Sequence, residues 1–161
     1  MTGEPDLRWH GHVADHGALV ARIEAWTVSD AVPESIADVL RVARALLIDS
    51  YFIYEYSLVA ATWALLATEA CLKDCVPRNS DKGPDKRTFG PLIREALRRG
   101  LIRQDEADAL RGAAELRNRI VHGYLRPKDP GESYTPQDAM VMLESIHEAV
   151  SDLYARALIA P

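Results

Sequence analysis

The chain has 161 residues, of which 48% are hydrophobic and 27% are charged, and its net charge at pH 7 is -5. This balance is typical of one soluble globular domain with a substantial core. The longest stretch without a charged side chain, residues 56–68, is thirteen residues long and therefore too short to cross a bilayer as a helix. Residues 1–16 lack a basic segment followed by an apolar run, so no signal peptide is evident. We therefore expect a cytoplasmic protein without a membrane partner.

Turn signals separate an N-terminal extension, residues 1–32, from a helical domain, residues 33–161. Pro33 suits the first turn of a helix, and the apolar residues behind it recur at helical spacing to about residue 48. Residues 51–75 predict a second helix that is apolar on nearly every side, so it lies either at the centre of a bundle or between subunits. Residues 77–86 are polar and rich in turn formers, which indicates a loop.

Three further helices are expected in the second half of the chain. A short helix starts at about residue 89 or 91 and is stopped by Gly100. Residues 104–122 carry an apolar stripe at helical spacing, and this helix should end at Gly123. After a loop at residues 126–134, Thr135 followed by a proline is the pattern of a helix N-cap. Since no strand pattern is present, the predicted fold is all-α, an up-and-down bundle of four or five helices.

Two groups of metal-ligand residue types do not predict a metal site. Cys71 and Cys75 are the only cysteines, and their spacing of four favours a structural role as small apolar residues over a redox or zinc motif. His10, His12 and His16 include two histidines one helical turn apart, a spacing that suits zinc or nickel. Such a cluster near a chain end is more often incidental. We predict no metal and no cofactor.

The negative net charge is unevenly distributed along the chain. Residues 78–128 contain thirteen Lys and Arg against seven Asp and Glu. Two interpretations stay open: a positive surface that holds a phosphate backbone, or the solvated faces of two amphipathic helices. The basic residues concerned are Arg94, Arg98, Arg99, Arg103, Arg111, Arg117, Arg119, Arg126 and Lys128.

The most informative stretch is residues 117–124, with the sequence Arg-Asn-Arg-Ile-Val-His-Gly-Tyr. A guanidinium presents a planar fork of donors to phosphate oxygens, and a histidine both takes and gives a proton near neutral pH. Cleavage of RNA without a metal needs these two functions. Asn118 and His122 are four residues apart and share a helix face. The alternative is structural: solvated arginines at a helix C-terminus, with His122 and Gly123 as an ordinary C-cap.

The spacing from Arg117 through His122 to Tyr124 resembles the Arg-x4-His-x-Tyr signature of HepT-type toxins in the HEPN superfamily. Arg117 and His122 match the two defining positions. Asn118 matches the frequent polar residue after the arginine, and Tyr124 matches the HepT-type tyrosine. The resemblance implies a four- or five-helix bundle that forms a two-fold homodimer, with the two motifs facing each other across a cleft. It also implies a metal-independent endoribonuclease that acts as a toxin or a phage-defence effector.

In such a dimer, His122 would act as general acid and base on the ribose 2'-hydroxyl and the leaving 5'-oxygen of RNA. Arg117 would stabilise the charge on the phosphorane. Glu69 is a lone acid in an apolar helix, so a partner such as Arg117 or Arg119 is expected. That pair would either orient the arginine or tie two helices together, and the second role is favoured.

The resemblance also bears on partners. Tyr124 is either a target for AMP transfer by an antitoxin or a tyrosine that packs the helix end. The chain shows no nucleotidyltransferase pattern, so such an antitoxin would be a separate polypeptide. Compared with HepT-type chains, the segment before Pro33 and the loop at residues 77–86 look like additions. The alternative function is a non-catalytic HEPN bundle that binds a nucleotide or a partner protein.

Overall fold

The structure is a computed structural model that describes residues 3–77, 86–123 and 134–159; between residues 116 and 123 it describes the side chain of Asn118 only. In this described part the chain contains α-helices and one short 3-10 helix but no strand, which confirms the all-α class. The elements are η1 (Leu7–Trp9), α1 (His16–Glu24), α2 (Glu34–Asp49), α3 (Glu55–Cys75), α4 (Phe89–Arg98), α5 (Gln104–Gly123) and α6 (Pro136–Ile159).

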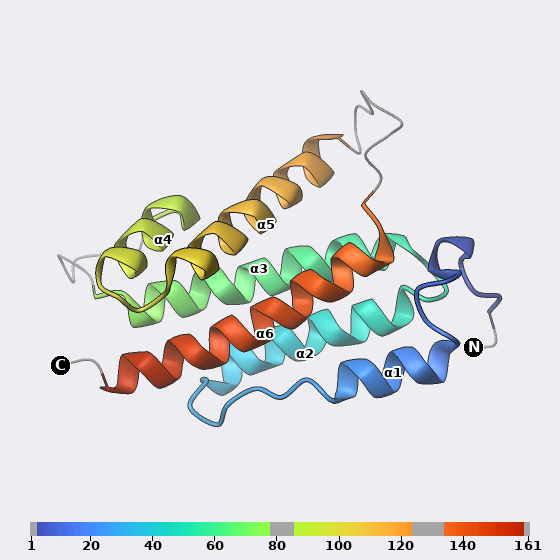
Figure 1. Cartoon of the computed structure of the whole chain (residues 1–161), viewed down its shortest axis with the longest axis horizontal. Coiled ribbons are helices and arrows are strands. Elements are labelled where there is room, and N and C mark those ends of the chain that lie inside the picture. The colour runs from blue at the N-terminus through green and yellow to red at the C-terminus, as the bar shows by residue number, and fades with distance from the viewer. Residues whose placement is uncertain (1–2, 78–85, 124–133, 160–161) are drawn as a thin grey trace.

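Helix α3 is the central element of the bundle. It contacts α2 and α6, which run beside it, and also α4 and α5, which lie over its other side (Figure 1). Its buried positions are mostly small side chains, which allow neighbouring helices to approach closely. The buried small residues of α3 are Ser57, Ala60, Ala61, Ala64, Ala67, Thr68 and Cys71. No helix in the described ranges is both long enough and apolar enough to span a membrane.

The start of α3 differs from the sequence prediction by one turn. The helix begins at Glu55 rather than at Tyr51, because the chain turns between these residues. The Tyr51 carbonyl accepts a hydrogen bond of 2.8 Å from the backbone N–H of Asp6. This bond ties the turn to the N-terminal segment and uses an acceptor that a continuous helix would have used internally.

The N-terminal segment contains a helix that the sequence analysis did not predict. Helix α1 is capped by Asp15, whose carboxylate accepts a hydrogen bond of 2.8 Å from the Ala18 N–H. Leu19 and Ile23 of α1 are buried in the same core as the bundle. Trp9 is buried as well, and its indole N–H donates to the Ser50 carbonyl at 2.7 Å. The N-terminal segment therefore packs against the bundle.

Two predicted helix boundaries are confirmed. Gly100 follows α4 with a φ of +70°, the left-handed conformation that stops a helix and favours glycine. At the start of α6, Thr135 and Asp138 form a reciprocal cap. The Asp138 carboxylate accepts from the Thr135 N–H at 2.8 Å, while the Thr135 hydroxyl accepts from the Asp138 N–H at 3.2 Å.

Arg87 connects the chain ahead of α4 to the end of α3. Its guanidinium donates to the Val76 carbonyl at 3.0 Å and to the Pro77 carbonyl at 3.2 Å. Carbonyl groups at a helix C-terminus lack partners within the helix, and a cation there also complements the helix dipole. The Arg87 side chain therefore provides hydrogen-bond donors for carbonyl groups at the end of α3 and also positions the start of α4.

His147 is a buried histidine in the middle of α6. Its Nδ1 lies 2.7 Å from the Leu143 carbonyl oxygen, and its ring packs against Trp26 at a centroid distance of 5.3 Å. Its Nε2 has no hydrogen-bond partner among the residues that the structure describes. Burial is the main cause that lowers the pKa of His147, and the charge of Arg44 lowers it further, whereas the bond to Leu143 opposes these effects. The imidazole is therefore neutral in the folded protein at pH 7.

We expect the free energy of unfolding to decrease as the pH falls below about 6.5, the ordinary pKa of histidine. Below this pH the unfolded chain takes up a proton that His147 in the folded chain binds only at lower pH. The contribution of the neutral His147 to the free energy of unfolding is therefore present above about pH 6.5 and decreases as the pH falls below it. His147→Phe keeps a ring at this site and should flatten the dependence between about pH 7.5 and pH 5.5, as measured by urea denaturation. Replacing His10, whose side chain is exposed, with Gln is the matched control. A His147→Phe variant with the wild-type slope would contradict the assignment.

Candidate functional site

The Arg-x4-His motif lies at the C-terminal end of α5. Arg117, Asn118 and His122 all belong to this helix, which the structure describes as far as Gly123, the residue at which the sequence predicts its end. The Asn118 side chain is exposed. Residues four apart in an α-helix share a face, so the backbone places Asn118 and His122 one turn apart on one side of α5. The side chains of Arg117 and His122, and the whole of Tyr124, lie outside the described residues.

The opposite end of α5 is anchored to α6 by a two-pronged ion pair. Arg156 donates to the two carboxylate oxygens of Glu106 at 2.6 and 2.8 Å, and also to the Leu101 carbonyl at 3.2 Å. The same carboxylate accepts from the Arg103 N–H at 2.6 Å, which satisfies a free donor at the start of α5. The hydrogen bond from Arg156 is the main cause that lowers the pKa of Glu106.

The orientation of α5 follows from this anchor. Its N-terminal end is held at α6, and Figure 1 shows its C-terminal half rising away from α6. Helix α5 also contacts α3 and α4. The motif is therefore carried on the end of a helix whose other end is fixed to the bundle.

The partner of Glu69 comes from its own helix. Its carboxylate lies 2.5 Å from the Lys73 ammonium, one turn further along α3, and its side chain is 26% exposed. The sequence analysis expected Arg117 or Arg119 because it treated Glu69 as a lone buried acid. The acid is instead half-buried and has a local cation, an arrangement common in helices. The side chains of both arginines lie outside the described residues, so a further role of Glu69 at the motif remains a proposal.

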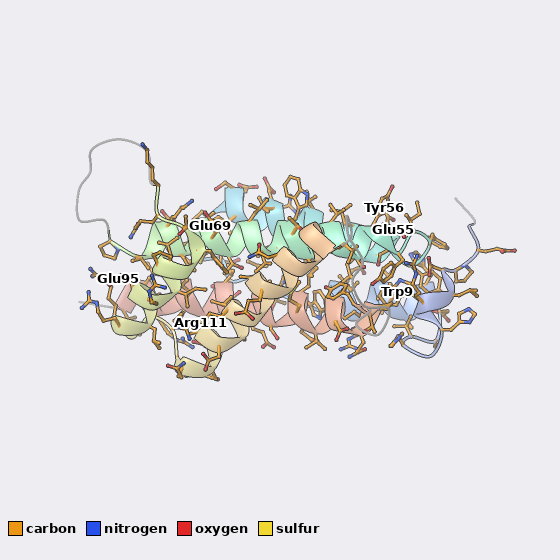
Figure 2. The ribbon with its side chains drawn as sticks, turned by 90° about the horizontal axis from the view of Figure 1, so that it is seen from above. Trp9, Glu55, Tyr56, Glu69, Glu95 and Arg111 are labelled. Atoms are coloured by element: carbon orange, nitrogen blue, oxygen red, sulfur yellow. The ribbon has the colours of Figure 1, made fainter. Side chains whose placement is uncertain are left out.

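Arginines of the basic segment ahead of the motif form ion pairs with acidic residues of their own helices. Arg98 and Arg99 both pair with Glu95, and Arg111 pairs with Asp108, each within about one helical turn. Figure 2 labels Glu95 and Arg111. The hydrogen bonds from the two arginines hold the pKa of Glu95 at about 2. These contacts favour the interpretation of solvated amphipathic faces for α4 and the first half of α5. The basic residues at 117, 119, 126 and 128 have no described side chains.

An exposed apolar stripe runs along α3. Its members recur at alternating intervals of three and four residues, which keeps them on one side of the helix. Tyr56, at the N-terminal end of the stripe, lies on the outer edge of α3 in Figure 2. The large members are between 36% and 51% exposed. The stripe consists of Tyr56, Val59, Trp63, Leu66 and Ala70 and contains no charged residue.

The described part of the chain offers no cluster of three His, Cys, Asp or Glu side chains that could hold a metal ion. The N-terminal histidines do not converge: the His16 ring packs against Phe52 at a centroid distance of 4.9 Å. Cys71 is buried and Cys75 half-buried, both as free thiols in α3.

The family described as "Ribonuclease HepT-like" matches residues 56–129. The HepT-like segment, a little under half of the chain, runs from α3 through α5 and contains the whole motif from Arg117 to Tyr124. This match confirms the resemblance to HepT-type chains of the HEPN superfamily that the motif shows. No curated protein and no solved structure gives a significant match to the chain.

The HepT-like segment depends on α6, which lies outside the matched range, for its anchor. We expect Glu106→Gln to lower the free energy of unfolding by about 1–2 kcal/mol, because it weakens charge-assisted hydrogen bonds to a half-buried guanidinium. Asp108→Asn is the matched control on the same helix, since its pair with Arg111 is exposed and screened by solvent and should contribute much less to stability. Urea denaturation measures both changes. Equal losses in the two variants would show that the anchor is not specific.

Proposed function

We propose that the chain is a metal-independent endoribonuclease of the HEPN type that acts as a toxin or a phage-defence effector. The observation that carries this proposal is the HepT-like match over residues 56–129, which includes Arg117, Asn118, His122 and Tyr124 at the positions of the motif. Two structural features support it. The motif occupies the end of α5, which projects from the bundle, and the Asn118 side chain is open to solvent.

The proposed chemistry is an internal transfer at one phosphate of RNA. A His122 imidazole takes the proton of the ribose 2'-hydroxyl, and the oxygen attacks the adjacent phosphorus. A second proton, given by a His122 imidazolium, goes to the 5'-oxygen as its bond to phosphorus breaks. Arg117 stabilises the additional negative charge on the phosphorane. The products are a 2',3'-cyclic phosphate and a 5'-hydroxyl, and no step requires a metal or a cofactor.

One His122 cannot easily serve as both base and acid in the same step, so the proposal includes a two-fold homodimer. The exposed stripe of α3 supports it, because apolar residues at alternating intervals of three and four are the pattern of a helix-to-helix seam. Helix α5 crosses and contacts α3, so pairing along this stripe would bring the α5 helices of both protomers close to the shared interface.

We further propose that a separate nucleotidyltransferase antitoxin controls the site through Tyr124. Transfer of AMP from ATP to the phenol oxygen would release pyrophosphate and place a phosphate beside Arg117 and Arg119. That phosphate would occupy the cations that RNA needs. Intact-mass measurement after co-expression with the antitoxin should show an added AMP that is absent in Tyr124→Phe. An unmodified chain in a neutralised complex would remove this part of the proposal.

The catalytic role of the motif predicts a large loss of RNA cleavage in His122→Ala and Arg117→Ala. General acid-base catalysis contributes about 10² to 10⁴ in rate, so the loss in His122→Ala should be plainly measurable with a labelled RNA oligonucleotide. Asn118→Ala should have a smaller effect. EDTA should leave the wild-type rate unchanged.

Arg111→Ala is the matched control, because Arg111 lies earlier on α5 and pairs with Asp108. It should keep most of the cleavage rate, and circular dichroism should show equal helicity for all variants. If His122→Ala cleaves at the wild-type rate, or if EDTA stops cleavage, the catalytic proposal is wrong. Retained RNA binding without cleavage by the wild-type protein would favour the non-catalytic alternative.

The proposed dimer predicts that Trp63→Glu converts the protein to a monomer and lowers cleavage by at least about tenfold, since a buried charge at a helix seam costs more than 1.4 kcal/mol. Sedimentation velocity measures the oligomeric state. Leu158→Glu is the control, because it adds the same charge at an exposed leucine near the end of α6. A wild-type monomer at micromolar concentration, or a Trp63→Glu dimer, would contradict the proposed seam.

A further inference from the structure

We propose that the groove between α5 and α6 binds a basic amphipathic helix from a partner protein. The groove has a volume of about 510 Å³ and lies on the side of α5 that faces α6. It opens because α5 is anchored to α6 near its N-terminal end and diverges from it toward the motif (Figure 1). The inference concerns binding at this groove and does not depend on RNA cleavage at the motif.

The floor of the groove is apolar and is made by both helices. Leu110 and Ala113 of α5 and Ile146 of α6 form its base and are almost fully buried. Ala109 and Val141 lie at its edges, where Val141 is 48% exposed. The alanine side chains are too small to fill the groove. The exposed valine beside it adds apolar surface whose contact with water is unfavourable. These features suit the side chains of an apolar helix face.

The rim of the groove is acidic. Among the described residues, five carboxylates line it, Asp105, Glu106, Asp138, Glu148 and Asp152, against one lining cation, Arg103. Arg156 neutralises Glu106 and contacts Asp152, but Glu148 is exposed and forms no ion pair within the described residues. A surplus of negative charge around an apolar floor attracts lysine and arginine side chains and repels phosphate. The groove therefore suits a basic protein segment and does not suit RNA.

The length of the groove sets the length of its occupant. Its lining residues span 103–113, from just ahead of α5 into its first half, and 138–152 on α6. At 1.5 Å per residue these spans correspond to about 15 and 21 Å, or roughly three to four helical turns. A helix of about 10–14 residues with apolar anchors at intervals of three and four matches this length.

A second copy of the chain fits the groove less well. Among the described residues, the exposed apolar stripe of α3 is an extended apolar face, and it contains no charged residue. Docking that stripe in the groove would supply no cation to the carboxylates of the rim. The charge pattern therefore favours a different polypeptide over self-association.

The test uses a fluorescein-labelled synthetic helix of about fourteen residues, with leucine along one face and lysine on its flanks. Fluorescence anisotropy at physiological salt measures its affinity for the full chain. Two peptides serve as comparisons: a scrambled isomer of the same composition, and a counterpart with glutamate in place of lysine. We expect the amphipathic lysine peptide to bind at least tenfold more tightly than either comparison.

Variants then locate the binding site. Ala109→Arg and Glu148→Lys should each weaken binding of the lysine peptide at least tenfold, because they add a cation to the groove. Ala45→Arg on α2 and Glu24→Lys on α1 are the matched controls at exposed positions and should change binding less than about twofold. Amide chemical shifts on titration should change mainly in residues 103–113 and 138–152.

Each of the following results would overturn the proposal: no binding of the lysine peptide, equal binding of the scrambled peptide, or equal weakening by the control variants. Displacement of the peptide by an RNA oligonucleotide would assign the groove to RNA instead. A lower sedimentation coefficient for the chain alone in Glu148→Lys, with no peptide present, would show that a second copy occupies the groove.

Discussion

The close packing around α3 is the constraint on which the rest of the molecule depends. Four helices contact α3, and its buried side chains are small enough for them to approach it closely. Ala60 and Ala64 are completely buried. A larger side chain at either position would clash with a neighbouring helix, because the interior is close-packed. The position of α5, and with it the motif, is set by this helix and by the anchor to α6.

Stability and proposed chemistry are separated along the length of α5. Near the start of the helix, Glu106 contributes an ion pair and a backbone cap, and Ala107 and Leu110 are buried. The motif occupies the last two turns, beyond the described contacts with α6. The groove between α5 and α6 has a related origin, because α5 is anchored to α6 near its start and diverges from it toward the motif.

The sequence predicted the structural features that depend on residues close together in the chain. Apolar residues at helical spacing predicted α2 to α6, and Gly100 and Thr135 marked two boundaries, since both signals act within a few residues. Helix α1 was missed because it has only nine residues, and its buried side chains are matched by partners far along the chain. The partner of Glu69 was assigned to distant arginines although Lys73 is one turn away. The groove could not be predicted, because it depends on the angle between two helices.

Arg87 fastens the two ends of the segment between α3 and α4. Its hydrogen bonds to the carbonyl groups of Val76 and Pro77 close a loop whose length is the number of residues between these positions and Arg87. Doubling the length of such a ring adds only about 0.6 kcal/mol to the entropy cost of closing it. Related chains can therefore differ in the number of residues here while α4 keeps its place, and this part of the protein is suited to carry an inserted tag or probe.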